Sequence, residues 1–267
     1  MSVRLLAFSI AAAVLVPCAA ARPSATHVTI AASAVPWMVA GDRLGVRGTV
    51  TPHPSGIQLT LQQWYGSGWK SLTDGAVRAD GGFTFSLRPD KAGSTAFRVV
   101  TAKGTDFSGA SDRVPVKVFK WSYMGNITAF QYVDPLSGEV SLEPNVSNGV
   151  HYDHAVSMDA GCYNQWSGSA WADFPLQRLY ERFTATVGLG GGATTGSTAT
   201  YRLVGGDGKQ LASGSLTFGA PAQKISVSLE GEYRLRMWIN VPDPTGAGGC
   251  SNQYTQVVFG DAKLLGP

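Results

Sequence analysis

The side chains best suited to molecular recognition gather in one segment, GCYNQWSGSAWADF, residues 161–174. A sugar is recognised by a flat aromatic surface that contacts its ring and by convergent polar side chains that bind its hydroxyl groups. The segment supplies both kinds of group, in Tyr163, Asn164, Gln165, Trp166 and Trp171. This composition indicates the chemistry of sugar recognition.

The start of the chain, MSVRLLAFSIAAAVLVPCAAARPSA, has the features of an export signal. Export matters for the cysteines, because it would place them in an oxidising compartment. Arg4 precedes a short apolar run, and Ala19 and Ala21 have the spacing of an export cleavage site. We predict that residues 1–21 are a signal peptide and that the protein is secreted. The apolar run is shorter than a bilayer-spanning helix, so we expect no membrane span.

Removal of the signal peptide leaves two cysteines, Cys162 and Cys250. Thiols pair in an oxidising compartment, so we predict one disulfide, which would stabilise the fold by about 4 kcal/mol. The bond would bring Asn252, Gln253 and Tyr254 close to the aromatic segment. Two interpretations remain open: the bond assembles a sugar site, or it joins two long loops whose rings cap the end of the fold.

Several other classes of function lack the residues that they need. The net charge of +3 is too small and too dispersed for a nucleic-acid partner. The stretch GGDGKQLASG lacks the spacing and the helix of a phosphate-binding loop, and Asp207-Gly208 instead predicts the corner of a β-hairpin. No nucleophile elbow or carboxylate signature is recognisable, so we do not expect an enzyme.

The stretch HYDH offers His151, Asp153 and His154 as metal ligands. Residues three apart on a strand point to opposite faces, which argues against a shared site for zinc.

Residues 22–120 read as short segments that alternate apolar and polar residues between turns, as in Leu44 and Val46. This period predicts roughly seven strands, which suit a β-sandwich. The stretches LGVRGTVTP, LTLQQWYGSGWKSL and RADGGFTFSLRP resemble the bacterial Ig-like domains of secreted proteins. The resemblance implies a spacer or adhesive module in which Trp64, Tyr65 and Trp69 pack within a hairpin.

Residues 121–267 form a second unit, in which Phe183, Ala185 and Val187 illustrate the same alternation. The pattern predicts the half-buried strands of an antiparallel sheet. Four cations fall on its polar positions: Arg202, Arg234, Arg236 and Lys224. They indicate either a patch for acidic polysaccharide or a solvated outer face.

The ordered stretches YERFTATVGL, YRLVGGDGKQLASGSL, ISVSLEGEYRLRMWI and VVFGDAKLL resemble the NPCBM family of carbohydrate-binding modules. The resemblance implies a galactose-binding-like, jelly-roll β-sandwich that binds terminal sugars of glycans, often beside a glycosidase domain. Such folds often hold a structural Ca²⁺, and the sequence leaves open whether this chain binds one. No other cofactor is expected.

The chain departs from the family pattern at several positions. Asp159, in SMDAG, stands where the family commonly carries histidine, which makes it a candidate sugar ligand by resemblance. Phe259 replaces the tryptophan of the closing W-A-D-A-R-L element, whereas Asp261 is retained.

The sequence therefore predicts an all-β protein, an Ig-like sandwich followed by a galactose-binding-like sandwich. Its expected function is non-catalytic binding of extracellular or cell-wall carbohydrate. The predicted site residues are Tyr163, Asn164, Trp166, Trp171, Asn252, Gln253 and Asp159. The alternative is a structural or protein-interaction module that keeps the fold without binding sugar.

Overall fold

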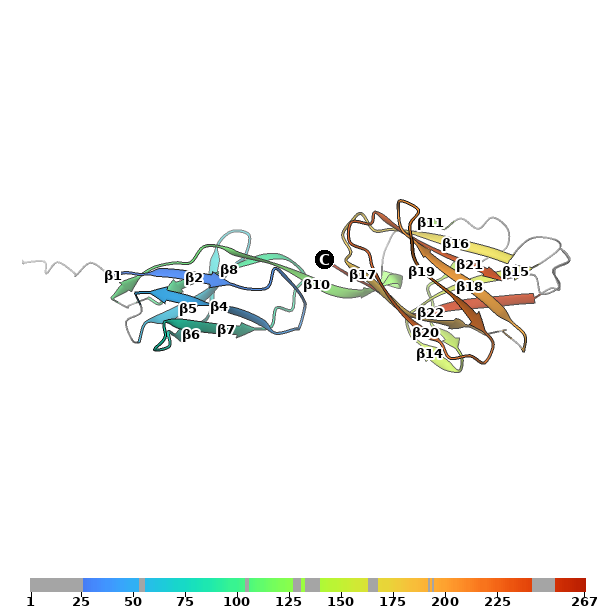
Figure 1. The fold of residues 1–267 in the computed structure, drawn as a ribbon, viewed down its shortest axis with the longest axis horizontal. Coiled ribbons are helices and arrows are strands. Elements are labelled where there is room, and N and C mark those ends of the chain that lie inside the picture. Colours follow the sequence, from blue (N-terminus) through green and yellow to red (C-terminus); the bar gives the residue numbers. More distant parts are fainter. Residues whose placement is uncertain are drawn as a thin grey trace, which may run out of the picture.

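The computed structural model describes residues 26–52, 56–103, 106–126, 131–132, 140–162, 168–191, 193, 195–241 and 253–267 (Figure 1). The predicted signal peptide, residues 1–21, lies outside these ranges. Regular structure within them is β-strand apart from one 3₁₀ turn, η1 (Met124–Asn126). The described residues contain no helix with the length and apolarity of a membrane span. The all-β prediction is confirmed.

Two sheets make up the N-terminal half. One has the order β2–β4–β7, with β2 (Thr29–Ser33), β4 (Leu44–Thr51) and β7 (Gly82–Leu87). The other runs β10–β8–β5–β6, with β10 (Val114–Tyr123), β8 (Gly93–Thr101), β5 (Gln58–Trp64) and β6 (Trp69–Ala76). The short strands are β3 (Trp37–Val39), parallel to β10, and the parallel pair β1 (Thr26–His27) and β9 (Phe107–Ser108).

The two N-terminal sheets enclose one core. Val46 and Phe85 from the first sheet pack in the same buried cluster as Leu59, Phe97 and Val116 from the second. Alternate residues of β4, β5, β7, β8 and β10 supply these side chains, which is the alternation seen in the sequence. This half is therefore a β-sandwich, and its assignment as Ig-like remains a prediction.

The C-terminal half contains two larger sheets. The first has the order β12–β15–β22–β17–β20, with β12 (Val140–Ser141), β15 (Ala155–Cys162), β22 (Gln253–Gly266), β17 (Arg182–Leu189) and β20 (Gln223–Ser228). The second has the order β11–β16–β21–β18–β19, with β11 (Gln131–Tyr132), β16 (Gly168–Pro175), β21 (Arg234–Val241), β18 (Thr198–Val204) and β19 (Gln210–Thr217). A separate hairpin consists of β13 (Asn145–Ser147) and β14 (Val150–Tyr152).

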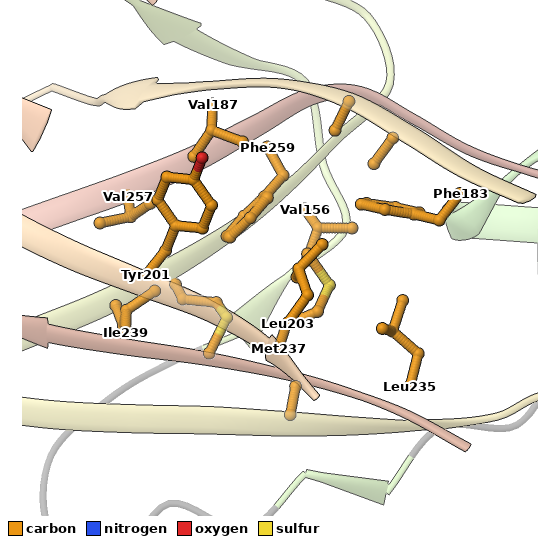
Figure 2. Close-up of a cluster of buried hydrophobic side chains, with 14 of the residues drawn as sticks. Val156, Phe183, Val187, Tyr201, Leu203, Leu235, Met237, Ile239, Val257 and Phe259 are labelled. Carbon is orange, nitrogen blue, oxygen red and sulfur yellow. The ribbon is translucent and has the colours of Figure 1, made fainter. Parts of the chain in front are cut away.

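Figure 2 shows the buried cluster that joins these two sheets. Val156, Phe183 and Phe259 come from the first sheet, and Tyr201 and Met237 come from the second. All five side chains are at most 2% exposed. Burial of this apolar surface holds the sandwich together, and it turns the intervening residues of each strand outward.

Strand β10 runs from one half into the other (Figure 1). Its residues Val114–Val118 pair with β8, and Lys120–Tyr123 pair with the last residues of β22. The strand thus crosses the predicted domain boundary at residue 120. At the junction, Nζ of Lys117 lies 3.6 Å from Oε1 of Glu181. A hollow of ≈ 350 Å³ lies at the same place, and the exposed Trp37 is one of its lining residues.

Strand β22 carries a bulge where it pairs with β17. The register shifts between Thr184, which pairs with Lys263, and Thr186, which pairs with Gly260. Asp261 lies in the bulge with φ of 50°, a left-handed conformation that Asp tolerates better than most residues. Asp261 therefore has a backbone role in this fold.

The glycine-rich stretch after β18 is a hairpin turn, as the sequence predicts. The amide of Gly205 donates to the carbonyl of Lys209 at 2.8 Å, and the amide of Lys209 donates to Asp207 Oδ1 at 2.8 Å. Gly208 has φ of 86°, whereas Asp207 does not adopt a positive φ. The turn therefore uses one left-handed residue, Gly208, and not the two that a type I′ turn at Asp207-Gly208 would have.

Candidate functional site

The outer surface of the second C-terminal sheet combines indole rings with charged and amide groups. Along β16, Ala170, Ala172 and Phe174 enter the core, so that Ser169, Trp171 and Asp173 face outward. Along β21 the residues Leu235, Met237, Ile239 and Val241 are buried, and the outward positions are Arg234, Arg236, Trp238 and Asn240. Two strands that are far apart in the sequence thus present complementary groups on one face.

Strand register aligns these groups in a row across the sheet. Trp171 pairs with Trp238, Trp238 pairs with Arg202 of β18, and Arg202 pairs with Ser213 of β19. We call the outward side chains of Trp171, Asp173, Arg202, Arg236 and Trp238 the Trp–Arg face.

Each indole of the Trp–Arg face lies against a guanidinium group. The Cζ of Arg236 lies 3.7 Å from the ring centroid of Trp171, and the Cζ of Arg202 lies 3.9 Å from that of Trp238. Contacts at these distances are cation–π interactions. They hold both arginines in defined positions above the sheet.

Asp173 fixes one of these arginines further. Its carboxylate accepts hydrogen bonds from Nε and Nη2 of Arg236, both at 2.8 Å, and from Nη1 of Arg234 at 3.2 Å. The hydrogen bonds to Asp173 raise the pKa of Arg236 above its usual value, and partial burial opposes them. Arg236 is therefore a permanent cation held in a bidentate pair.

A shallow hollow of ≈ 270 Å³ lies beside the second stack. Its outward-facing lining residues are Thr200, Arg202, Gln210, Ser213, Ser215 and Trp238. The hollow combines one cation, one indole, three hydroxyl groups and one amide, which suits a polar ligand with several hydroxyl groups.

The next row of the sheet leads from the Trp–Arg face toward the rim. Ser169 Oγ donates to Asn240 Oδ1 at 2.8 Å, directly before the ends of β16 and β21. Residues 163–167 directly precede β16 in the sequence and residues 242–252 directly follow β21, and these two segments contain most of the predicted site. The Trp–Arg face thus lies near the paired strand ends, Gly168 and Val241, that border both segments in the sequence.

The structure describes only some of the predicted site residues. Tyr163, Asn164, Trp166, Asn252 and Cys250 lie outside the described residues.

The remaining predicted residues occupy both sheets. Trp171 belongs to the Trp–Arg face, and the backbone of Gln253 in β22 pairs with that of Cys162 at the end of β15. Asp159 lies on the outer face of β15, because Met158 and Ala160 beside it enter the core. Its Oδ1 accepts a hydrogen bond of 2.8 Å from Gln256 Nε2. Asp159 and Trp171 therefore face away from each other on opposite sides of the sandwich.

The histidines of the HYDH stretch have separate environments. His151 Nε2 lies 3.2 Å from Asp153 Oδ1, whereas the ring of His154 stacks on Tyr123 with centroids 3.7 Å apart. Among the described residues, no group of three or more His, Cys, Asp or Glu side chains is arranged to hold a metal ion.

Sequence reasoning missed Trp238 and the role of Arg202. The signal was present in the alternation of β21, where Arg234, Arg236, Trp238 and Asn240 occupy every second position. The sequence analysis also grouped Lys224 with the three arginines of the second sheet. Lys224 instead lies in β20, which belongs to the first sheet.

Comparisons with known proteins identify the C-terminal half. The sequence model described as "NPCBM/NEW2 domain" matches residues 146–265. This match confirms the predicted family of that half and, with the two packed sheets, its galactose-binding-like sandwich. A comparison with curated proteins finds no match.

Solved structures from Clostridium perfringens are also similar to the chain. One holds the CBM51-2 and INT domains of ZmpB, with 12% identity and a TM-score of 0.40, and the match covers 66% of this chain and 38% of that one. Another is the CBM51 of GH95 in complex with methyl-galactose, with 16% identity, a TM-score of 0.38, and coverage of 54% and 99%. The chain thus spans well under two thirds of the ZmpB fragment.

Proposed function

We propose that this chain, whose residues 146–265 form an NPCBM/NEW2 domain, is a secreted, non-catalytic protein that binds extracellular or cell-wall carbohydrate. The observation that carries the proposal is the Trp–Arg face, where Trp171 and Trp238 lie opposite each other on an open sheet. Indole rings contact the apolar faces of sugar rings, and the surrounding donors and acceptors bind sugar hydroxyl groups.

The proposed site also includes predicted residues that are next to Cys162 and Gln253 in the sequence. Tyr163, Asn164 and Trp166 follow Cys162, and Asn252 precedes Gln253, whose backbone pairs with that of Cys162. Cys250 is three positions before Gln253, and a chain of three residues spans at most about 11 Å. A disulfide between Cys162 and Cys250 would therefore join residue 250 to the end of β15, next in the sequence to Tyr163 and Asn164.

Non-catalytic binding is supported by the state of the carboxylate on this face. Asp173 accepts hydrogen bonds on both oxygens from Arg236 and Arg234, so it is occupied as an ion-pair partner. Glycoside hydrolysis requires a pair of carboxyl groups, one of which must exchange a proton with the substrate. An arrangement that locks its carboxylate in this way favours binding over turnover.

The proposal is tested with a glycan array and with pull-down on insoluble polysaccharides. We expect the protein to bind at least one glycan, and Trp171→Ala and Trp238→Ala to weaken that binding about tenfold or more, since stacking on one ring contributes roughly 1–3 kcal/mol in comparable cases. The matched control is Trp64→Ala, which removes an indole from the N-terminal half. Unchanged melting temperatures would assign the loss to the site.

The alternative function is a structural or protein-interaction module, and one observation favours it. The guanidinium groups of Arg202 and Arg236 cover one face of each indole, as they would in a stack that only stiffens the sheet. Absence of any bound glycan at millimolar concentration, with the fold intact, would support this alternative and contradict carbohydrate binding.

A further inference from the structure

We propose that the hollow beside Arg202 is a subsite for a carboxylated sugar residue, so that the glycan bound by the C-terminal half is acidic. This inference rests on the proposed function and adds a ligand class to it. It depends on three features of the hollow: the orientation of Arg202, the charge around it and the neutral polar groups that line it.

The stack on Trp238 leaves the hydrogen-bonding edge of Arg202 available. A cation–π contact uses none of the five N–H donors of a guanidinium group, and within the described residues Arg202 donates no side-chain hydrogen bond. The Cζ of Arg202 is 3.9 Å from the Trp238 ring centroid, and the residue is exposed to solvent. Because the contact with Trp238 restricts the Arg202 side chain before binding, this side chain loses less entropy when it pairs with a carboxylate.

The charges on the Trp–Arg face leave Arg202 without a counterion. Arg236 of this face and the neighbouring Arg234 share Asp173, which is the one carboxylate of the face. Within the described residues, Arg202 makes no ion pair, and its described contact is the stack on Trp238. An acidic ligand would supply the missing partner through a bidentate pair of charge-assisted hydrogen bonds.

The other lining groups suit a sugar. Thr200, Ser213 and Ser215 present hydroxyl groups, and Gln210 Nε2 donates to Ser213 Oγ at 3.1 Å, which leaves the amide oxygen of Gln210 as an acceptor. A uronate residue carries one carboxylate and several hydroxyl groups on one ring. That combination matches a hollow with a single cation among neutral donors and acceptors.

Arg236 offers an internal contrast. It stacks on Trp171 as Arg202 stacks on Trp238, but its Nε and Nη2 already donate to Asp173. The same scaffold therefore produces one arginine satisfied by the protein and one that is available to a ligand. The subsite is assigned to Arg202 for this reason.

The experiment measures binding to polygalacturonate, alginate and hyaluronan, and to methyl-esterified polygalacturonate as a neutral counterpart of the same backbone. We expect at least one acidic polymer to bind, esterification to weaken binding where polygalacturonate is bound, and Arg202→Gln to weaken binding about tenfold or more. Arg202→Lys keeps the charge but loses the planar fork, so it should fall between Arg202→Gln and the wild type.

Arg98→Gln is the matched control. Arg98 also stacks on an indole, with Cζ 4.4 Å from the Trp69 ring centroid, and the variant makes the same change in net charge in the N-terminal half. It should bind acidic polymers like the wild type. Circular dichroism and thermal melting of each variant establish that the fold is retained.

The outcomes separate this inference from the proposed function. Binding of neutral glycans alone, or equal effects of Arg202→Gln and Arg98→Gln, would overturn the acidic subsite and leave carbohydrate binding standing. Binding of dextran sulfate that both variants weaken equally would indicate non-specific attraction of polyanions and would also overturn it. Absence of binding to every glycan would overturn both proposals.

Discussion

Each half of the molecule contains a cross-strand pair of tryptophans beneath arginines, but the two pairs are built differently. In the N-terminal half, Trp64 and Trp69 pair across the β5–β6 hairpin. Their ring centroids are 5.4 Å apart, and the angle between the ring planes is 64°. In the C-terminal half, Trp171 and Trp238 pair across β16 and β21, and each ring lies under its own guanidinium group at 3.7 or 3.9 Å.

The neighbours of the rings account for the difference. Arg98 stacks on Trp69 at 4.4 Å, and its Nε donates to Gln62 Oε1 at 2.8 Å, so this arginine has a partner within the hairpin. Arg202 has hydroxyl groups and a hollow beside it instead. An aromatic pair is the better candidate for a binding surface where, as at Arg202, the stacked cation has no side-chain hydrogen bond within the described residues and a hollow lies beside it.

The largest expected difference between the halves concerns the disulfide. Both cysteines of the predicted mature chain, Cys162 and Cys250, belong to the C-terminal half, so a reductant should destabilise that half alone. We expect a loss of about 4 kcal/mol, because reduction frees a long loop in the unfolded state. Calorimetry with and without dithiothreitol measures it, and two titratable thiols in the native, unreduced protein would refute the bond.

A smaller effect is expected from the carboxylate of the Trp–Arg face. Asp173→Ala leaves Arg234 and Arg236 without a counterion at a site where the Asp173 side chain is only 15% exposed, so we expect a loss of about 2 kcal/mol in the free energy of unfolding. Urea denaturation provides the measurement.

Asp80→Ala is the control for this variant. It unpairs the exposed Arg78 and removes the acceptor of one backbone hydrogen bond, from the amide of Gly82 at 2.8 Å, so it should shift the urea midpoint less than Asp173→Ala does. Equal shifts for the two variants would show that the Asp173 cluster does not stiffen its sheet.

The smallest expected effect is the coupling between ring partners. A double-mutant cycle on Trp64 and Trp69 should give about 1 kcal/mol, as expected for an edge-to-face aromatic pair. A cycle on Trp238 and Arg202 should give about 0.5 kcal/mol, because an exposed cation–π contact is weaker. If Trp64 and Trp69 showed no coupling, hairpin packing would not explain the N-terminal pair.

The sequence was sufficient for the strands and for several turns. Alternation in segments such as Leu235, Met237 and Ile239 predicts buried faces that the structure confirms, because period two leaves no other way to bury them. The hairpin after β18 was predictable from Gly208, whose φ of 86° few other residues adopt.

The site was only partly predictable, because it depends on register between distant strands. Ser169 and Asn240 are 71 positions apart, and nothing local in either segment specifies that they meet. The positions of Asp159 and Lys224 show the same limit: alternation tells which residues avoid the core, but it does not tell which of two outer faces they share. Strand order and register decide this, and they arise from packing of the whole sandwich.

The most direct test of the Trp–Arg face is an NMR titration with a glycan that binds in the array. It follows the indole N–H signals of the seven tryptophans as this glycan is added. We expect the signals of Trp171 and Trp238, assigned through their alanine variants, to shift until the protein is saturated with glycan. The signals of Trp64 and Trp69 should stay in place. Shifts at Trp64 and Trp69 with none at Trp171 and Trp238 would contradict it.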